Sequence, residues 1–454
     1  MPRFLYHKSF ALDVPSETVY KWYQHQGTFE RLTPPWVKMR VKEYDGLKEG
    51  VLVKFQIQKA FFNLEWQARI EAVTENAGFT DRQVKGPFAF WKHEHGIKYV
   101  ADNKCRVNDH VQYELPFGKL LNNRWGKRKA QLELARLFRY REEITRADLV
   151  DFYRPCDRSM TFLVTGATGT VGSALKHFLR SQGHVVKELS LTRPYKGAFY
   201  WDYYKEEPNR EWFEGVDVVV HLAGYPIFCR WTAQNKKKIL ESRWTSTAKL
   251  ADYLAKEPCR PPVFICASGI NFYGTDRDGV LDEKTPGGNG FLAEVTKQWE
   301  EACDPLRRVG ARVINIRTGM VLTPAAGGLA AMLPIFRLGL GGRIGSGKQM
   351  VSWIAIDDLV DAIYYMSTQG SIEGPVNVCA PESLTNKAFS DTLADRLGRI
   401  AILPLPEIMA KLFMGDLAKE TVLANLKATP KVLLESGYRF RYPRLESALA
   451  HLVV

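Results

Sequence analysis

Three closely spaced glycines, Gly166, Gly169 and Gly172, give the strongest chemical signal in the sequence. They follow a short apolar run at residues 161–165 and open a segment with helical spacing, so they lie in a strand–turn–helix unit. Gly166 allows the tight turn, Gly169 lets a pyrophosphate approach the backbone, and Gly172 lets helix and strand pack closely. The phosphates would bind at the amides that begin the helix. The predicted dinucleotide contacts in this loop are Gly166, Thr168, Gly169, Thr170, Val171 and Gly172.

The end of the following strand discriminates between the two nicotinamide dinucleotides. An acidic side chain there would accept hydrogen bonds from the adenosine ribose and favour NAD, but this strand ends at Leu191, Thr192 and Arg193. Glu188 comes too early, within the strand. Arg193 could hold a 2′-phosphate through two parallel hydrogen bonds, or it could be an ordinary solvated loop arginine. We therefore favour NADP over NAD as the cofactor.

Two further patterns resemble binding sites only in part. His93 and His95 alternate as strand residues do, so they share one face, and a pair of this kind can bind a metal. Without a clear third ligand, a polar or cavity-lining role is favoured, and no metal site is predicted. Residues 342–349 have the spacing of a P-loop but lack the final Ser or Thr that would hold magnesium, which argues against an ATPase.

The elements that must position these residues change character near residue 150. Before it, segments such as 51–57, 66–73 and 110–115 have the alternation of antiparallel strands, and residues 124–140 have apolar side chains at helical spacing. This order predicts an α+β domain at residues 1–150, with a long helix laid over a curved sheet. Residues 151–159, which contain Pro155, form the expected linker.

From residue 160 onward, short apolar strands alternate with helical segments. The expected strands are residues 161–165, 185–191, 217–222, 263–267 and 312–317. Such a pattern predicts a doubly wound parallel sheet of the Rossmann type at residues 160–380. Residues 381–454 are predicted to be a mostly helical segment that packs on the end of this sheet.

Composition restricts the class of protein. The 454 residues are 45% hydrophobic and 25% charged, which is typical of soluble proteins with more than one globular domain. The formal net charge of +13 fits nucleic acid, anionic lipid or an anionic cofactor. No compact basic run with interleaved aromatic residues occurs, so nucleic acid is not expected as a partner. The basic segment 124–129 is interpreted as a solvated helix face.

Cysteine usage and apolar runs bear on the compartment. Seven scattered cysteines, with no C-x-x-C pair, argue against a disulfide framework and against a cysteine-based zinc site. The N-terminus lacks the apolar core of a signal peptide. The most apolar stretch, residues 319–336, is broken by prolines and glycines and is expected to form a buried loop and strand rather than a membrane span. We expect a cytoplasmic protein.

Residues 160–454 resemble the extended and atypical short-chain dehydrogenase/reductases, a superfamily that includes NAD(P)-dependent epimerases and dehydratases. Within it they are most similar to the branch called epimerase family proteins, including its C-terminal segment of unassigned function. The runs that carry this resemblance are residues 221–224, 230–232, 242–243, 272–274, 291–295, 299–300, 317–319, 339–342, 353–354, 357–358 and 440–443. The resemblance implies further cofactor contacts at Leu222, Ala223 and Gly224.

The N-terminal region resembles the SRPBCC superfamily, which has the START-like helix-grip fold. Residues 33–36, 86–88, 91–95 and 138–141 carry this resemblance. It implies a cavity between the sheet and the long helix that receives a hydrophobic ligand.

Catalysis in the dehydrogenase/reductase superfamily rests on a serine or threonine, a tyrosine and a lysine. The resemblance places Ser268 at the serine and Lys297 at the lysine, but Ala293 occupies the tyrosine position four residues earlier. The alternative roles are a strand end for Ser268 and a solvated helix lysine for Lys297. Tyr273 is a candidate substitute acid, with packing beside the cofactor as its alternative role. Arg317 could meet an anionic substrate or pack at a strand end.

Three functions fit these residues. The first is an NADP-dependent oxidoreductase or epimerase that acts on a small carbonyl or sugar-like molecule, with the N-terminal domain holding a hydrophobic substrate. The second is a non-catalytic NADP(H) sensor, which Ala293 favours. The third is a carrier of lipid or another hydrophobic ligand. We expect the first; the sequence leaves the substrate and the oligomeric state open.

Overall fold

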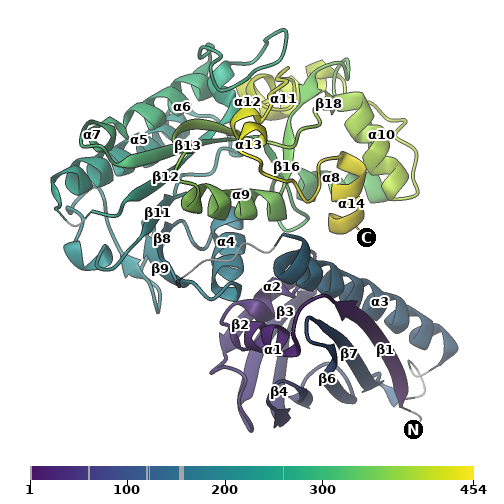
Figure 1. Ribbon diagram of the computed structural model, residues 1–454. Coiled ribbons are helices and arrows are strands. Elements are labelled where there is room, and N and C mark those ends of the chain that lie inside the picture. The colour runs from purple at the N-terminus through teal and green to yellow at the C-terminus, as the bar shows by residue number, and fades with distance from the viewer. Residues whose placement is uncertain are drawn as a thin grey trace. The chain divides into compact units, whose positions relative to one another are not determined.

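The computed structural model of the chain describes residues 3–59, 62–118, 121, 123–152, 158–258 and 260–453. The chain divides into two compact units, shown in Figure 1. One comprises Met1–Asp157 with His177–Gly183, and the other comprises Arg158–Lys176 with His184–Val454. Pro155 of the expected linker lies outside the described residues, as do Cys156 and Cys259. The five cysteines that are described are all free.

The first unit is built on an antiparallel sheet. Over the described residues its seven strands have the order β1-β7-β6-β5-β4-β3-β2. They are β1 (Phe4–Leu12), β2 (Lys38–Glu43), β3 (Leu52–Lys59), β4 (Phe62–Thr74), β5 (Gly78–Lys85), β6 (Phe90–Ala101) and β7 (Lys104–Glu114). The first strand pairs with the last along its whole length, from Phe4 opposite Tyr113 to Leu12 opposite Cys105. The antiparallel sheet expected in this part of the chain is confirmed.

A long helix covers one face of this sheet. Helices α1 (Ser16–Gln24) and α2 (Thr28–Arg31) connect β1 to β2, and α3 (Arg124–Arg146) follows β7. Trp91, His93 and His95 of β6 are buried. They lie on the same face of the sheet, because alternate side chains of a strand point to the same face. The ring of Phe138 on α3 packs edge-on against His93, with centroids 5.2 Å apart. The helix therefore lies over the face that carries the two histidines.

The second unit contains a parallel sheet. Its seven described strands have the order β10-β9-β8-β11-β12-β13-β17, and every pairing among them is parallel. They are β8 (Thr161–Thr165), β9 (Val185–Ser190), β10 (Phe199–Tyr200), β11 (Val218–His221), β12 (Val263–Gly269), β13 (Arg312–Thr318) and β17 (Gly374–Val378). The predicted parallel, Rossmann-like sheet is confirmed.

Helices lie on both faces of the parallel sheet. α4 (Thr170–Ser181) follows β8, and α5 (Ala233–Lys256) follows β11. In Figure 1, α5, α6 (Phe291–Glu301) and α7 (Asp304–Arg308) lie on one side of the sheet and α9 (Ile356–Thr368) on the other. The strand order reverses between β8 and β11, and such a reversal opens a crevice at the carboxyl ends of the strands. The predicted glycine loop, which follows β8, and the loop that starts at Leu222, which follows β11, both leave the sheet at this crevice.

Short strands and helices complete the second unit. β14 (Met320–Leu322) pairs with β16 (Trp353–Ala355), and β15 (Met350–Val351) pairs with β18 (Leu384–Thr385). The helices are α8 (Gly327–Arg337), α10 (Asn386–Arg396), α11 (Glu407–Met414), α12 (Asp416–Glu420), α13 (Lys431–Glu435) and α14 (Leu445–Leu452). The apolar stretch 319–336 thus contains a helix as well as a strand. Within the described part of the chain, no helix is both long and apolar enough to cross a membrane.

Candidate active site

The glycine loop after β8 is shaped by close backbone contacts. Gly166 has φ of +68°, in the left-handed region, and a Cβ there would lie 3.1 Å from the Ala223 nitrogen. A Cβ on Gly172 would lie 2.3 Å from the Gly166 carbonyl oxygen, so a side chain at this position would push the start of α4 off the turn. The Gly169 amide donates to that same oxygen at 2.9 Å. Gly166 and Gly172 are therefore required by the turn itself, which leads directly into the start of α4.

The loop after β11 is tied to the glycine-loop strand by one hydroxyl. Thr165, the last residue of β8, accepts hydrogen bonds from the amides of Leu222 (3.0 Å) and Ala223 (3.1 Å). Its Oγ also lies 2.9 Å from Nδ1 of the buried His221. These bonds hold residues 222–224, which the sequence assigns to the cofactor, against the carboxyl end of β8.

The end of β9 separates Glu188 from Arg193. Glu188 is buried, lies 3.0 Å from Lys176 Nζ and accepts a hydrogen bond from the Tyr195 hydroxyl at 2.8 Å. Its carboxylate is thus engaged inside the protein. Arg193 is exposed, and within the described residues its guanidinium makes no hydrogen bond or ion pair. Of these two residues, therefore, Arg193 alone has hydrogen-bond donors free to bind a ligand.

An arginine that the sequence interpretation did not select lies beside Gly224. Arg243 of α5 is buried, and its Nη1 donates to the carbonyl oxygens of Tyr225 (2.9 Å) and Ile239 (3.0 Å). A Cβ on Gly224 would lie 2.9 Å from its guanidinium carbon. Burial lowers the pKa of Arg243 to about 10. Among the described residues no carboxylate pairs with it, so the crevice holds a buried cation without an internal anion.

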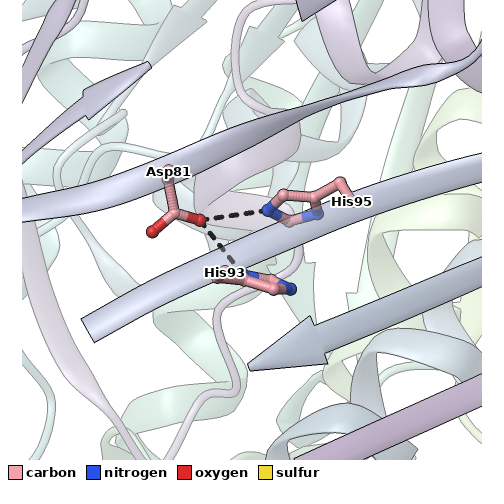
Figure 2. A group of neighbouring side chains, drawn as sticks. All are labelled: Asp81, His93 and His95. Atoms are coloured by element: carbon pink, nitrogen blue, oxygen red, sulfur yellow. Dashed lines mark hydrogen bonds and ion pairs between the residues drawn. The ribbon is translucent and has the colours of Figure 1, made fainter. Parts of the chain in front are cut away.

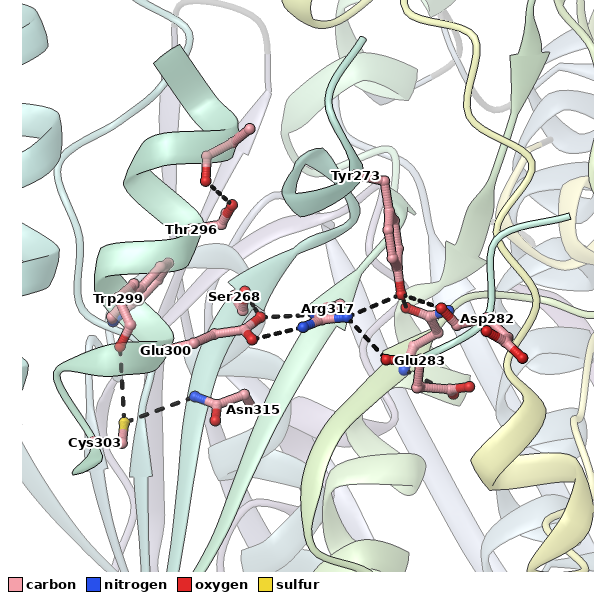
Figure 3. Close-up of polar contacts among 12 residues, drawn as sticks. Ser268, Tyr273, Asp282, Glu283, Thr296, Trp299, Glu300, Cys303, Asn315 and Arg317 are labelled. Atoms are coloured by element: carbon pink, nitrogen blue, oxygen red, sulfur yellow. Dashed lines mark hydrogen bonds and ion pairs between the residues drawn. The ribbon is translucent and has the colours of Figure 1, made fainter. Parts of the chain in front are cut away.

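Ser268 and Arg317 meet at one carboxylate, as Figure 3 shows. The Ser268 hydroxyl, near the end of β12, donates to Glu300 Oε1 at 2.7 Å. Arg317 of β13 binds both oxygens of Glu300, Nε to Oε1 at 2.8 Å and Nη2 to Oε2 at 2.8 Å. Glu300 lies on α6, three residues after Lys297, and sequence reasoning noted it only as part of a family run. It is the central acceptor of this cluster.

Tyr273 lies on the side of Arg317 opposite Glu300 in Figure 3 and is fully buried. Its hydroxyl accepts from Arg317 Nη1 at 3.1 Å and donates to Asn377 Oδ1 at 2.7 Å. Burial raises the pKa of Tyr273 to about 12, although the neighbouring Arg317 opposes that rise. The guanidinium of Arg317 also lies over the Phe272 ring, 3.4 Å from its centroid. Both predicted site residues are thus enclosed by protein groups.

Lys297 occupies a different environment on the same helix. Ala293, one turn earlier, is buried, whereas Lys297 is partly exposed and, within the described chain, its ammonium contacts no protein acceptor. Lys297, Glu300 and Phe272 line a hollow of about 390 Å³. The Cε of Lys297 lies so close to Gly287 that a Cβ on Gly287 would be only 2.6 Å from it. The structure therefore places Lys297 and Glu300 together, with Ser268 joined to them through Glu300.

A second cavity lies wholly within the first unit. It has a volume of about 710 Å³ and lies between the sheet and α3. Its walls are mainly aromatic and aliphatic, and include Phe55, Trp66 and Phe138. His93 and His95 line it, together with Asp81, so the two histidines do occupy a cavity wall.

Two segments of the second unit match known family models. Residues 162–379 match the NAD dependent epimerase/dehydratase family, and residues 405–452 match a domain of unknown function, DUF1731. Epimerase family protein Mb2239 of Mycobacterium bovis is 35% identical over 290 residues, which cover 63% of this chain and 96% of that protein. This chain belongs to the NAD dependent epimerase/dehydratase family. Human epimerase family protein SDR39U1 is 34% identical over 298 residues, covering 65% of this chain and 100% of that protein.

Solved structures extend the comparison with this family. The nucleoside-diphosphate sugar epimerase from Corynebacterium glutamicum is 30% identical with a TM-score of 0.81, and the match covers 99% of this chain and 90% of that one. Human SDR39U1, solved with NADPH, is 33% identical with a TM-score of 0.59, covering 64% of this chain and 99% of that one. The resemblance to epimerase family proteins is confirmed. The Corynebacterium match includes the N-terminal unit, whose resemblance to the SRPBCC superfamily stays a prediction.

Proposed function

We propose that this family member is an NADP(H)-dependent oxidoreductase or epimerase acting on a small carbonyl or sugar-like molecule. The observation that carries the proposal is the crevice between β8 and β11, where the tight glycine loop leads into the start of α4, together with Arg193, whose guanidinium has no partner among the described residues. The NADPH in the human relative's structure supports the same choice of cofactor. When bound, such a cofactor supplies or accepts a hydride.

Within this proposal, the predicted loop residues bind the dinucleotide. Backbone amides at the start of α4 would hold the pyrophosphate, because the positive end of a helix dipole attracts anions. Arg193 would bind the 2′-phosphate and so select NADP(H). We add Arg243 as a further cation facing the bound anion, because a buried arginine without an internal carboxylate gains most from an anionic partner. The proposed contacts are Gly166, Thr168, Gly169, Thr170, Val171, Gly172, Arg193, Leu222, Ala223, Gly224 and Arg243.

We propose Ser268, Lys297 and Glu300 as the groups that handle the substrate. Lys297 has a free ammonium at the hollow that Glu300 also lines, so it can orient a hydroxyl or hold a ribose. Glu300 accepts the Ser268 proton in a hydrogen bond and so fixes the hydroxyl, whose oxygen can then accept a hydrogen bond from a substrate hydroxyl. Tyr273 and Arg317 take their alternative roles in this proposal, as packing groups, because their polar atoms are already satisfied inside the protein.

The proposal is tested by binding and by hydride transfer. The full-length protein is titrated with NADPH and with NADH while the fluorescence of the reduced nicotinamide is followed. Tighter binding of NADPH is expected. Carbonyl compounds are then added and consumption of the reduced cofactor is measured. Nucleoside-diphosphate sugars are added separately and formation of the epimer is measured, because an epimerase regenerates its cofactor. Both assays compare the wild type with the Ser268→Ala, Lys297→Ala double variant. Turnover that survives in the double variant contradicts the assignment of these two residues.

A non-catalytic NADP(H) sensor is the second candidate. Ala293 in the tyrosine position and the enclosed Tyr273 hydroxyl favour it, since both remove the usual proton donor. It shares the cofactor site with the first proposal and differs only in chemistry. Any hydride transfer by the purified protein eliminates the sensor, whereas tight NADPH binding without transfer to any compound of the panel favours it.

We further propose that the first unit is a START-like domain of the SRPBCC superfamily that binds a hydrophobic ligand. The antiparallel sheet, the long α3 across it and the apolar cavity between them support this. Organic extracts of the purified protein are examined by mass spectrometry, and binding of a fluorescent fatty acid is measured. The absence of both a co-purified ligand and fluorophore binding would count against the proposal.

We also propose a cytoplasmic location for the protein. The Arabidopsis thaliana relative is named as chloroplastic.

A further inference from the structure

Two histidines and two aspartates form a compact cluster in the wall of the N-terminal cavity. His93 and His95 lie on β6, Asp81 on the neighbouring β5 and Asp109 on β7, on the other side of β6. The two imidazole rings are 3.7 Å apart between centroids. Both histidines and Asp109 are buried, and Asp81 is largely so. The proposal concerns this cluster and does not depend on the dinucleotide site.

One oxygen of Asp81 faces both histidines. Asp81 Oδ2 lies 3.0 Å from His93 Nδ1 and 3.1 Å from His95 Nε2, as Figure 2 shows. The other oxygen, Oδ1, accepts a hydrogen bond from the Trp91 indole at 3.1 Å. The indole therefore fixes the rotation of the carboxylate so that its free oxygen points at the two rings.

Asp109 lies at the opposite edges of the same rings. Its Oδ1 is 2.9 Å from His93 Nε2 and 3.4 Å from His95 Nδ1. Each histidine thus directs one ring nitrogen toward Asp81 and the other toward Asp109. For His93 this is the arrangement of a metal-binding histidine, in which the nitrogen that does not bind the metal donates to a carboxylate that fixes the tautomer. His95 Nδ1 faces the same carboxylate without a hydrogen bond to it.

We propose that His93 Nδ1, His95 Nε2 and Asp81 Oδ2 bind one divalent transition-metal ion, with Asp109 as the outer carboxylate. Ligand atoms at about 2.1 Å from an ion are about 3.0 Å apart in octahedral and about 3.4 Å apart in tetrahedral geometry, so the two separations to Asp81, 3.0 and 3.1 Å, match the octahedral spacing. The three ligand atoms all lie within 4.8 Å of one another. Two imidazoles and one carboxylate select zinc or ferrous iron over calcium or magnesium, which prefer all-oxygen sites.

Charge balance supports an ion at this place. Asp81 and Asp109 bring two negative charges into a mostly apolar cavity wall, and a single divalent cation compensates both. Arg141 of α3 also lines the cavity, and Trp66 and Phe138 form apolar walls.

The ion would keep coordination positions open toward the cavity. Three protein ligands leave at least one position for a water or an exogenous donor. The occupant that fits is a molecule with a large apolar body and one oxygen or nitrogen donor, since about 710 Å³ of largely apolar space adjoins the cluster. Such a ligand would be positioned by its donor atom on the metal and by burial of its body.

The experiment measures metal binding to the full-length protein without a histidine tag. After chelation and dialysis, the protein is titrated with Co²⁺ and followed by visible absorption, and with Zn²⁺ and followed by calorimetry. The wild type is expected to bind one ion per chain. His93→Gln and His95→Gln are each expected to weaken binding at least tenfold. Asp109→Asn should weaken it about 10- to 100-fold, because it removes only the outer carboxylate.

His110→Gln is the matched control. His110 lies next to Asp109 on β7, but it is exposed on the opposite face of the sheet and stacks on His7. Its binding isotherm should equal that of the wild type. Wild-type protein that takes up neither ion, or a His110→Gln variant that loses binding as much as His93→Gln, overturns the proposal. The wild-type titration decides the question even if a cluster variant fails to fold, and NADPH binding is a separate readout for the second unit.

Discussion

Thr165 Oγ lies 2.9 Å from His221 Nδ1 at the end of neighbouring parallel strands. Because the Thr165 oxygen already accepts from the amides of Leu222 and Ala223, its proton goes to Nδ1, and His221 Nε2–H faces the Ser246 hydroxyl at 3.2 Å. The imidazole is therefore neutral. Burial lowers the pKa of His221 to about 3. The loop that is proposed to bind the cofactor depends on a histidine that does not take up a proton.

This arrangement predicts a loss of stability in mild acid. Folding lowers the pKa of His221, so its contribution is complete above the unfolded-state value near 6.5 and is lost as the pH falls from there toward 3. Between pH 6.5 and 5 the wild type should lose about 2 kcal/mol through this group. Urea unfolding of wild type and His221→Gln at several pH values measures the difference in slope. His110→Gln, at an exposed position, should keep the wild-type slope; equal slopes in all three proteins would refute the prediction.

Replacement of Arg193 by alanine should change cofactor preference. Charge-assisted hydrogen bonds contribute about 1.5–3 kcal/mol, so the Kd for NADPH should rise about 10- to 150-fold while the Kd for NADH stays the same. Fluorescence titrations of both cofactors measure this. Arg210→Ala removes another exposed arginine of the same unit and should leave both constants unchanged. A parallel loss of NADH binding in Arg193→Ala would indicate a structural defect instead of a lost phosphate contact.

Glu300→Gln should destabilise the second unit. The substitution leaves the buried Arg317 without its carboxylate, and breaking a buried pair from one side costs about 3–5 kcal/mol. Thermal and urea unfolding measure the change. Glu301→Gln, at the exposed neighbouring position on α6, should change the free energy of unfolding by less than about 0.5 kcal/mol. If Glu300→Gln leaves the free energy of unfolding unchanged, the ion pair contributes little to stability.

Tyr273→Phe separates a packing role from an acid role. If Tyr273 packs, losing the bond to Asn377 should lower stability by about 1–3 kcal/mol and leave hydride transfer within twofold of wild type. Its pKa of about 12 also means that the hydroxyl stays protonated throughout the neutral range. Unfolding and turnover are measured on the same preparation. A large loss of turnover at unchanged stability would restore Tyr273 as the acid.

Much of the architecture could be read from local patterns. The parallel sheet followed from apolar strands alternating with helices, and the antiparallel sheet from alternation of apolar and polar residues, because both signals reflect which side chains a strand buries. The two-residue strand β10 and the late strand β17 were not predicted. Such short or glycine- and proline-containing strands are stabilised by hydrogen bonds to the neighbouring strand. Their own sequences have no periodicity from which a strand could be predicted. Helix α8 was missed for a related reason, since it contains Pro334.

By itself, the sequence determined the glycine loop, the absence of a carboxylate at the end of β9 and the family to which the chain belongs, because each depends on residues close together in the chain. Only the tertiary structure decided that Arg317 forms an ion pair with Glu300 and that Tyr273 is buried inside the protein. It alone brought Asp81 and Asp109 to the two sides of His93 and His95. Those contacts join residues from 12 positions apart (Asp81 and His93) to 104 positions apart (Tyr273 and Asn377). Strand pairing and helix packing, which local spacing does not encode, bring them together.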